Sequence, residues 1–279
     1  MNEQRTHRAT SPDGTEIVGT VHGQGPPLIL QHGAMDHGEI TWGSALPYLT
    51  DRYTCHVPSL RNRGRSGHSE DSSPPRLVED VTAYAASLGE PVALVGLSLG
   101  GVLVLGAAAE LEQATAVVSY EPAVTEVIDE ATFARFGGAL VQEAQEVEEG
   151  RLSDAIRTFG RLVGNDDEVA SLEAAGAFEV MGPNAPADLA VIGQASAYEG
   201  PRATDPEGLA RLDLPVLLLH GGRSQVRDWF DAAVRHVAVH VPHAEVRRLP
   251  ELGHLAPMVS PRPVADQIVR FLDQVGATV

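Results

Sequence analysis

Ser98 stands in a glycine-rich turn between a buried-strand pattern and a helix pattern, where positions 96–101 read Gly-Leu-Ser-Leu-Gly-Gly. Glycine two positions away on either side leaves room for neighbouring backbone, so a sharp, strained turn can project the serine hydroxyl into a cleft. A hydroxyl is a poor nucleophile at neutral pH and needs a histidine to accept its proton. The pattern predicts that Ser98 is a catalytic nucleophile. The alternative is an ordinary serine in a strand-to-helix turn.

Eleven histidines compete for the role of general base. His254 is favoured because it follows the last expected strand, 245–249, and precedes the terminal helix, which places its imidazole on a loop at the edge of a sheet. His32 ends an early strand, and the stretch 32–35 is better suited to present a backbone N–H to an oxyanion. We therefore predict His254 as the base, with a surface-loop histidine as the alternative.

The elements that must position these residues alternate between strand and helix patterns. Runs typical of strands lie at 16–21, 27–31, 53–58, 91–97, 114–120, 214–219 and 245–249, and helix patterns lie at 76–88, 99–111, 226–237 and 263–275. Such alternation predicts an α/β fold with a mostly parallel sheet flanked by helices. The strand rhythm stops after 121, so we expect a core of 1–121 and 205–279 with an inserted helical cap at 122–204. Acidic runs in that insertion, 143–149 and 166–168, are expected to be solvated faces.

The composition excludes several classes of protein. With 43% hydrophobic and 21% charged residues and no run of eighteen apolar positions, the chain is expected to be soluble and globular, without a membrane partner. A net charge of -18 repels nucleic acid phosphates, and the densest basic cluster is only Arg61, Arg63 and Arg65. The expected partner is therefore a small-molecule substrate, bound by a monomer or homodimer.

Redox and targeting features are sparse. Cys55 is the single cysteine and the polar stretch 1–12 lacks the apolar run of a secretory signal, so a cytoplasmic protein is expected. The histidine, cysteine and carboxylate residues show no zinc-type spacing, and Gly221-Gly222 lacks the rest of a dinucleotide fingerprint. We therefore expect neither a metal nor a cofactor.

Four motifs follow one another along the chain: the turn at His32-Gly33, the RxRGRSG-like loop at 61–67, the elbow at Ser98 and the late Gly253-His254. In these motifs and their order the chain resembles the α/β-hydrolase superfamily. The resemblance covers most of the chain outside the insertion. It implies that the backbone N–H groups of Ala34 and Leu99 form an oxyanion hole. It also implies that the insertion forms a cap.

The acid of the triad departs from the commonest pattern of this superfamily. Members usually carry an aspartate shortly after the strand 215–220, but there this chain reads Gly221-Gly222-Arg223-Ser224. Glu121 follows the strand 114–120, which is the fifth run found here and which the resemblance makes the sixth strand of the superfamily. Pro122 favours an extended backbone at Glu121, so its carboxylate could face the cleft. A branch of the haloalkane dehalogenases has a similar placement. We predict Glu121 as the acid, with Asp228 in reserve; the alternative is that Glu121 only closes a strand or pairs with an arginine.

A serine at the elbow favours acyl transfer, because halide displacement and epoxide opening in this superfamily use a carboxylate there. The predicted reaction is hydrolysis of an ester or lactone of a small, largely apolar substrate through an acyl-enzyme. Met35 and Trp42, together with Leu99, are expected to line the mouth of the site. Thioester or carbon–carbon bond hydrolysis by the same triad is the alternative within the enzyme class. A non-catalytic binding protein with a hydrolase fold is the alternative from another class.

Overall fold

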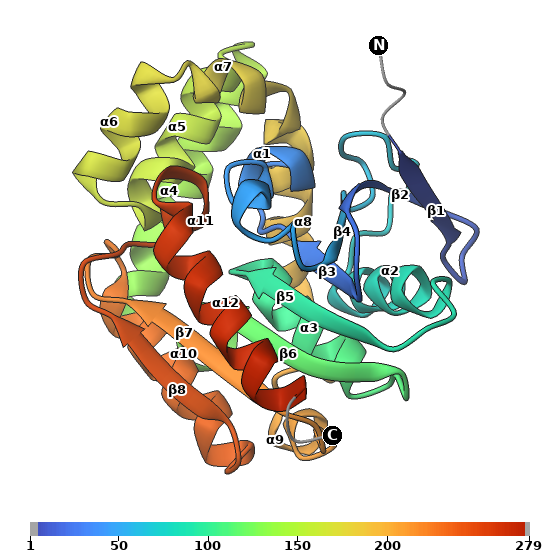
Figure 1. Cartoon of the computed structure of the whole chain (residues 1–279). Helices are drawn as coiled ribbons and strands as arrows, with labels where there is room; N and C mark the ends of the chain where they lie inside the picture. The colour runs from blue at the N-terminus through green and yellow to red at the C-terminus, as the bar shows by residue number, and fades with distance from the viewer. Residues whose placement is uncertain (1–4, 277–279) are drawn as a thin grey trace.

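The computed structural model describes residues 5–276, and within them eight strands form one sheet in the order β1-β2-β4-β3-β5-β6-β7-β8 (Figure 1). Only the pairs β1–β2 and β2–β4 are antiparallel. The strands are β1 (Thr6–Thr10), β2 (Glu16–Gly23), β3 (Pro27–Gln31), β4 (Thr54–Pro58), β5 (Val92–Leu97), β6 (Ala114–Tyr120), β7 (Val216–Gly221) and β8 (Glu245–Leu249). The predicted α/β fold class with a mostly parallel sheet is therefore confirmed.

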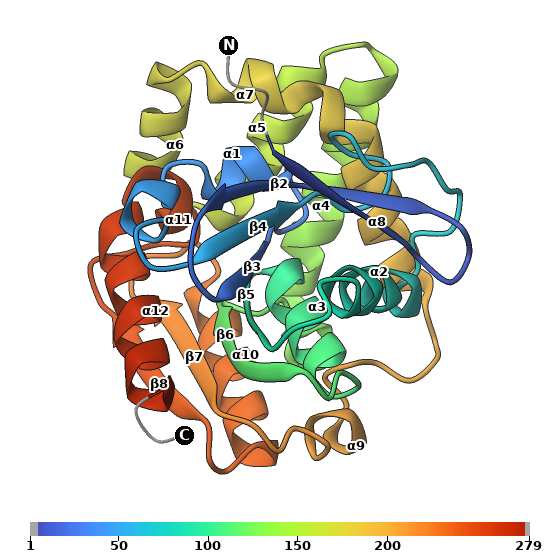
Figure 2. The same ribbon diagram turned by 45° about the vertical axis from the view of Figure 1, so that its right-hand side comes forward.

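Helices cover both faces of this sheet (Figures 1 and 2). Ile29 of β3 packs with α2 (Pro74–Ala86), α3 (Leu99–Ala108) and α10 (Arg227–His240). Its neighbours Leu28 and Leu30 pack on the opposite face, against α12 (Pro261–Gly276) and α1 (Gly38–Trp42). Alternate side chains of a strand point to opposite faces, so a strand covered on both sides reads as a continuous apolar run. This explains why β3 and β5 are buried along their whole length.

The strand rhythm is interrupted between β6 and β7 by a helical insertion, which we define as α4 to α8. Its members are α4 (Glu130–Glu148), α5 (Leu152–Val163), α6 (Asp166–Ala174), α7 (Ala177–Met181), η3 (Gly182–Asn184) and α8 (Ala185–Ala197). Figure 1 shows α4 to α7 gathered over one end of the sheet. Met35, just beyond β3, and Leu255, just beyond β8, share an apolar cluster with Phe159 of α5. The insertion therefore lies over the carboxyl ends of the parallel strands.

The predicted solvation of the acidic runs in this insertion is correct for four residues, the exposed Glu148, Glu149, Asp166 and Asp167, and wrong for the other three. Glu143, Glu146 and Glu168 are all buried. Glu146 accepts a hydrogen bond from the Thr158 hydroxyl of α5 at 2.8 Å, and Glu168 completes the N-terminal capping box of α6 with Asn165. A run of charge along a helix does not reveal which of its members face a neighbouring helix, and here some of them do.

Several short elements were not predicted from the sequence. β1 lies in a stretch expected only to be polar, and the helices α1, α9 (Pro206–Leu209) and α11 (Ala256–Val259) are too short to show a periodic pattern. The single-turn elements η1 (Leu46–Tyr48) and η2 (Thr125–Val127) were likewise too short to be predicted. No helix within residues 5–276 has both the length and the apolar character needed to cross a bilayer.

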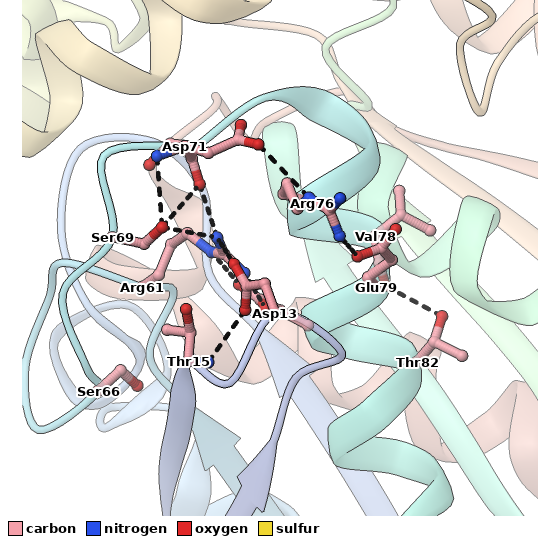
Figure 3. A network of polar contacts seen from close by, with 12 residues as sticks. Asp13, Thr15, Arg61, Ser66, Ser69, Asp71, Arg76, Val78, Glu79 and Thr82 are labelled. Atoms are coloured by element: carbon pink, nitrogen blue, oxygen red, sulfur yellow. Dashed lines mark hydrogen bonds and ion pairs between the residues drawn. The ribbon is translucent and has the colours of Figure 1, made fainter.

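The basic cluster found in the sequence does not form a basic surface. Figure 3 shows Arg61 enclosed by polar groups, and its Nη1 donates to Asp13 at 2.7 Å and to the Asp71 carbonyl at 2.6 Å. Its Nε and Nη2 donate to the two oxygens of Asp80 at 2.7 and 2.6 Å. Arg63 is also buried. Both guanidinium groups are used inside the fold and not for docking.

Candidate active site

Ser98 occupies the turn between β5 and α3 with φ 58° and ψ -120°. Positive φ in a residue other than glycine is strained by roughly 1–2 kcal/mol, so surrounding contacts must hold it. The Ser98 N–H donates to the Tyr120 carbonyl at 2.9 Å, and the Ser98 carbonyl accepts from Ala123 at 3.2 Å. A side chain at Gly96 or at Gly100 would clash with backbone oxygen atoms. Gly96 is therefore required by the sharpness of the elbow, and Gly100 by the close approach of α3 to the end of β3.

His254 and Glu121 meet in the folded chain. The Nδ1 atom of His254 lies 2.7 Å from Oε2 of Glu121, and both side chains are buried. Asp228, the reserve candidate for the acid, lies elsewhere: its side chain is 86% exposed and pairs with Arg227. Because Nδ1 is engaged by the carboxylate, Nε2 is the nitrogen left to face a nucleophile.

The backbone at Glu121 differs from the extended conformation predicted from Pro122. Its φ is +43°, in the left-handed region. A following proline disfavours the right-handed helical region but does not by itself select an extended one. The Glu121 N–H still donates to the Leu219 carbonyl at 2.8 Å, as if continuing the β6–β7 pairing, while the chain turns sharply into Pro122.

Ser224 supports this carboxylate instead of replacing it. Its hydroxyl lies 2.8 Å from Oε1 and 2.9 Å from Oε2 of Glu121, and the Gly221 N–H donates to Oε1 at 2.8 Å. Hydrogen bonds from these donors and from the His254 ring offset the cost of burying the negative charge. The residue at the position where the superfamily usually carries an aspartate thus donates to a carboxylate from the end of the neighbouring strand.

The turn after β3 brings a backbone donor beside Ser98. His32 Nε2 accepts from the Leu60 N–H at 2.9 Å, so its proton is on Nδ1, which lies 2.8 Å from the Gly33 carbonyl. Burial lowers the pKa of His32 well below its usual value, consistent with a neutral ring. Since C=O and N–H of a trans peptide point in opposite directions, the Ala34 N–H points away from His32. His32 is therefore placed to orient a backbone donor and not to act as a base.

Leu99 is the second predicted donor. It is the first residue of α3, a position whose N–H has no carbonyl partner within its own helix. Ala34, Ser98 and Leu99 line one cavity together. A Cβ added at Gly33 would lie 3.2 Å from the Ser98 Cβ, which shows how closely the two loops approach.

Two cavities of different size meet at Ser98. The large cavity has a volume of about 790 Å³ and extends between α3 and the insertion, with Ala34, Leu99, Val102 and Phe159 in its wall. The small pocket, of about 20 Å³, is lined by Ser98 and His254 together with Gly33, Ala34, Met35, Asp36, Thr41, Leu97, Phe159, Val163, Leu255 and Met258. Met35 thus reaches the site. Ser98 and His254 are 156 positions apart in the sequence, yet both line this pocket.

Trp42 does not line either cavity. It is wholly buried with Leu28 and Leu30 beneath the sheet. The prediction that Trp42 lines the mouth is therefore corrected. The short helix α1 turns this side chain toward the sheet, an orientation that sequence spacing does not specify.

The sequence matches the alpha/beta hydrolase family over residues 21–267. This chain belongs to that family. A pimeloyl-[acyl-carrier protein] methyl ester esterase of Xanthomonas oryzae pv. oryzae is 29% identical over 268 residues, covering 93% of this hydrolase and 98% of the relative. A pyrrolizixenacetamide deacetylase of Xenorhabdus hominickii is 33% identical over 95 residues, which are 32% of this chain and 35% of the relative.

Solved structures agree with this assignment. An alpha/beta hydrolase from Sphaerobacter thermophilus is 26% identical, with a TM-score of 0.72 and coverage of 95% of this chain and 100% of the other. The esterase RhEst1 from a Rhodococcus species shares the fold at 22% identity, with a TM-score of 0.77 and coverage of 97% and 99%. The predicted family, fold class and hydrolase class are confirmed.

Three residues near the histidine of this hydrolase were not identified from the sequence as part of the site. Phe230 stacks on His254 with ring centroids 4.5 Å apart and planes 5° apart, which suits a ring that becomes cationic. Glu168 of the insertion packs so closely on Gly253 that any side chain at Gly253 would clash with it. Burial raises the pKa of Glu168 to about 7. The third is Ser224. Only Glu168 had a sequence signal, the Asn-x-x-Glu spacing of a capping box.

A buried ionic cluster lies next to the small pocket and joins the insertion of the hydrolase to its core. Arg63 donates to the Asp36 carbonyl at 3.0 Å and lies 3.5 Å from Asp188 of α8. Burial raises the pKa of the Asp36 carboxyl to about 7 and that of Glu143 on α4 to about 9, the latter helped by the nearby charge of Asp188. Within residues 5–276 no group of three or more His, Cys, Asp or Glu side chains is arranged to hold a metal ion.

Proposed function

We propose that this hydrolase cleaves carboxylic esters, lactones included, through an acyl-enzyme on Ser98, with His254 as general base and Glu121 as the acid that holds it. The observation that carries the proposal is the 2.7 Å contact between Glu121 and His254 beside the pocket that Ser98 lines. A buried carboxylate on Nδ1 fixes the tautomer in which Nε2 can accept a proton. The names of the relatives, a pimeloyl-[acyl-carrier protein] methyl ester esterase and a pyrrolizixenacetamide deacetylase, support acyl transfer.

The reaction proceeds in two balanced halves. Ser98 Oγ attacks the ester carbonyl carbon, its proton passes to His254 Nε2, and the negative charge on the carbonyl oxygen is held by the N–H groups of Ala34 and Leu99. The bond to the alcohol oxygen breaks, and that oxygen takes the proton from His254. Water then attacks the carbonyl carbon of the acyl-enzyme and gives a proton to His254. The bond between Ser98 Oγ and the acyl carbon breaks, and Oγ takes that proton back from His254. The products are one carboxylic acid and one alcohol for an open-chain ester, and a single hydroxy acid for a lactone.

In this proposal the helical insertion serves as a cap, with residues 122–204 lying over a core of 1–121 and 205–279. Phe159 and Val163 of α5 stand in the walls of both cavities, so the insertion would exclude water from the bound ester. A cytoplasmic location and a monomeric or homodimeric state stay predictions.

A fluorophosphonate probe tests the proposal directly. We expect rapid covalent labelling of the folded wild type and release of p-nitrophenol from p-nitrophenyl butyrate, with both lost in Ser98→Ala. Ser171→Ala is the matched control, because Ser171 is an exposed serine on α6 whose hydroxyl donates to the Asp167 carbonyl within the same helix. Labelling that survives Ser98→Ala would show that another residue reacts with the probe and would reject Ser98 as the nucleophile. A folded wild type that is neither labelled nor active would favour a binding protein.

A further inference from the structure

The turn between α5 and α6 of the insertion, residues 163–168, docks on the core beside the triad; we call it the α5–α6 corner. On the loop after β7, the Gln225 N–H donates to the Val163 carbonyl at 3.1 Å. Arg223 of the same loop pairs with Asp167 at 2.6 Å. The corner is therefore fixed to the loop that also supplies the hydroxyl donor to the triad carboxylate.

The same corner packs on the loop that carries the base. Gly253, the residue before His254, is held from two sides. From the core, the Tyr120 hydroxyl donates to the Gly253 carbonyl at 2.7 Å. From the insertion, Glu168 and Asn165 approach so closely that any side chain at Gly253 would clash with both. The helix α6 also packs beside α11, which follows this loop (Figures 1 and 2).

We propose that Glu168 is a positioning residue for His254: from the insertion it fixes the loop of the base and sets a second buried carboxylate beside the ring. The inference rests on the proposed function and deepens it, since no member of the triad comes from the insertion. In this hydrolase the insertion then completes the base as well as covering the substrate.

The charge of Glu168 is only partly satisfied where it lies. Its Oε2 accepts from the Asn165 N–H at 3.0 Å, whereas its Oε1 is buried without a hydrogen-bond partner within residues 5–276. Burial raises the pKa of Glu168 from 4.5 to about 7, so the carboxyl group is protonated below that pH and ionised above it. A buried negative charge with few donors acts on its neighbours more strongly than an exposed one.

The charged groups around Glu168 leave His254 as its principal buried counterpart. The positive form of His254 favours the ionised carboxylate, and Glu121 at the end of β6 opposes it. Burial, with the two carboxylates nearby, keeps the pKa of Tyr120 well above its usual value, so the phenol is neutral. Arg223 is 47% exposed and therefore screened by water, and α11 has no charged residue. On the insertion side, charged residues of α5 and α7 pair with the other end of α6 or among themselves, or are exposed; they are Asp154, Arg157, Arg161, Glu173 and Glu179.

This arrangement affects the step in which the base becomes charged. When His254 takes the proton of Ser98, its ring becomes an imidazolium that negative charges stabilise. Glu121 provides one such charge by direct contact, and ionised Glu168 adds a second from the neighbouring helix. An opposite charge at about 4–6 Å shifts protonation by roughly 1–3 pH units, and we take the lower limit because Glu168 acts through space and through the loop.

A titration of the His254 ring by NMR tests the inference without any substrate. We expect the pH at which half of the rings are protonated to fall by about one unit in Glu168→Gln, because the ring loses a nearby negative charge. His254→Ala identifies the resonance. Glutamine retains the size of the side chain and can complete a capping box, so the fold should be kept. An unchanged titration in the folded variant would overturn the inference.

Asp166→Asn is the matched control. It removes an exposed carboxylate from the first turn of the same helix and changes the net charge equally. Because solvent screens this position, the His254 titration should move by less than about 0.2 unit. An equal shift in both variants would assign the effect to net charge and contradict a specific role of Glu168.

Kinetics provide the second readout, at about pH 8.5, where the carboxyl group of Glu168 is ionised. Glu168→Gln should lower kcat for p-nitrophenyl butyrate and the rate of fluorophosphonate labelling about fivefold to tenfold, with KM within about twofold, because only the charged form of the base is affected. Asp166→Asn should keep both rates. Unchanged rates in folded Glu168→Gln contradict the inference.

If Glu168→Gln does not fold, the wild-type titration decides. The His254 resonances should then show a second inflection near pH 7, where Glu168 ionises, and a single inflection contradicts the inference. Failure of the proposed function looks different. A protein that is labelled and active, but whose His254 does not respond to Glu168, contradicts this inference alone. A protein whose His254 responds, but which is neither labelled nor active, contradicts the proposed function alone.

Discussion

Glu121→Gln separates a triad that uses Glu121 from one that uses Asp228. Glutamine keeps the shape of the side chain but has one acceptor oxygen in place of two. Three donors now converge on the carboxylate: the Gly221 N–H at 2.8 Å from Oε1, the Ser224 hydroxyl, and the His254 ring at 2.7 Å from Oε2. The backbone N–H cannot rotate away, so it takes the amide oxygen and leaves the NH₂ group facing His254.

The consequence is a change of tautomer. An NH₂ group facing Nδ1 requires that nitrogen to be an acceptor, so the ring proton moves to Nε2, where it blocks proton transfer from Ser98. In a serine protease triad the comparable amide substitution costs about 10⁴-fold in kcat, which corresponds to about 5.4 kcal/mol. We expect a loss of about 10³- to 10⁴-fold in kcat for p-nitrophenyl butyrate.

The assay needs a control for folding and one for charge. Thermal unfolding followed by circular dichroism shows whether Glu121→Gln keeps its structure, since leaving one buried donor unsatisfied costs only about 1–3 kcal/mol. Asp228→Asn removes a carboxylate that is 86% exposed, so its kcat should stay within about twofold of the wild type. A folded Glu121→Gln that keeps more than a tenth of wild-type kcat, or a larger loss in Asp228→Asn, would refute the reasoning.

Ser224→Ala removes one donor to the triad carboxylate and should lower kcat about tenfold, with Ser224→Thr restoring most of it in the same ester assay; equal loss in both would contradict a hydroxyl role. Gly253→Ala should lower the free energy of unfolding in urea by about 1–3 kcal/mol, because the new methyl group clashes with the Glu168 carboxylate. Adding Glu168→Ala to this variant should partly restore the stability, whereas additive losses in the double variant would exclude the contact. The pKa of Glu143 is raised by burial from 4.5 to about 9, so the folded state holds a proton that the unfolded chain releases, and this stabilisation is present below pH 4.5 and lost as pH rises through 9. Glu143→Gln should therefore flatten the fall in unfolding free energy between pH 5 and 9 by at least about 1 kcal/mol, whereas the exposed Glu148→Gln on the same helix should follow the wild type; a parallel fall in both variants would disprove it.

Local sequence determined the elements of the core and the elbow. The strands at 27–31 and 114–120 were predicted with the bounds that the structure shows, because a strand buried on both faces leaves a continuous apolar run. The strand at 245–249 was also predicted with its observed bounds, although it is a partly exposed edge strand without such a run. Ser98 could be predicted for a similar reason. The glycines that its turn requires are two positions away along the chain, so the sequence alone reports the geometry.

The order of elements carried the prediction one step further. In a parallel sheet the loops that follow the strands meet at one edge, so Ser98 after β5 and His254 after β8 could be expected at the same edge without knowledge of side-chain positions. The structure places both in one pocket wall. The same argument favoured Glu121 as the acid over Asp228, and the structure places the Glu121 carboxylate 2.7 Å from His254 while the Asp228 side chain is 86% exposed.

Only the tertiary structure decided which groups face each other across the site. Ser224 is 103 positions from the carboxylate that it supports, and Phe230 stacks on His254 from a different element. The side chain of Trp42 turned toward the sheet, and those of Glu143 and Glu146 turned inward. Periodicity along a segment records that one face is apolar, but the partner of each side chain depends on packing between segments distant in sequence. Such contacts are specified by the whole fold, which is why the supporting residues, unlike the elbow, left no local pattern.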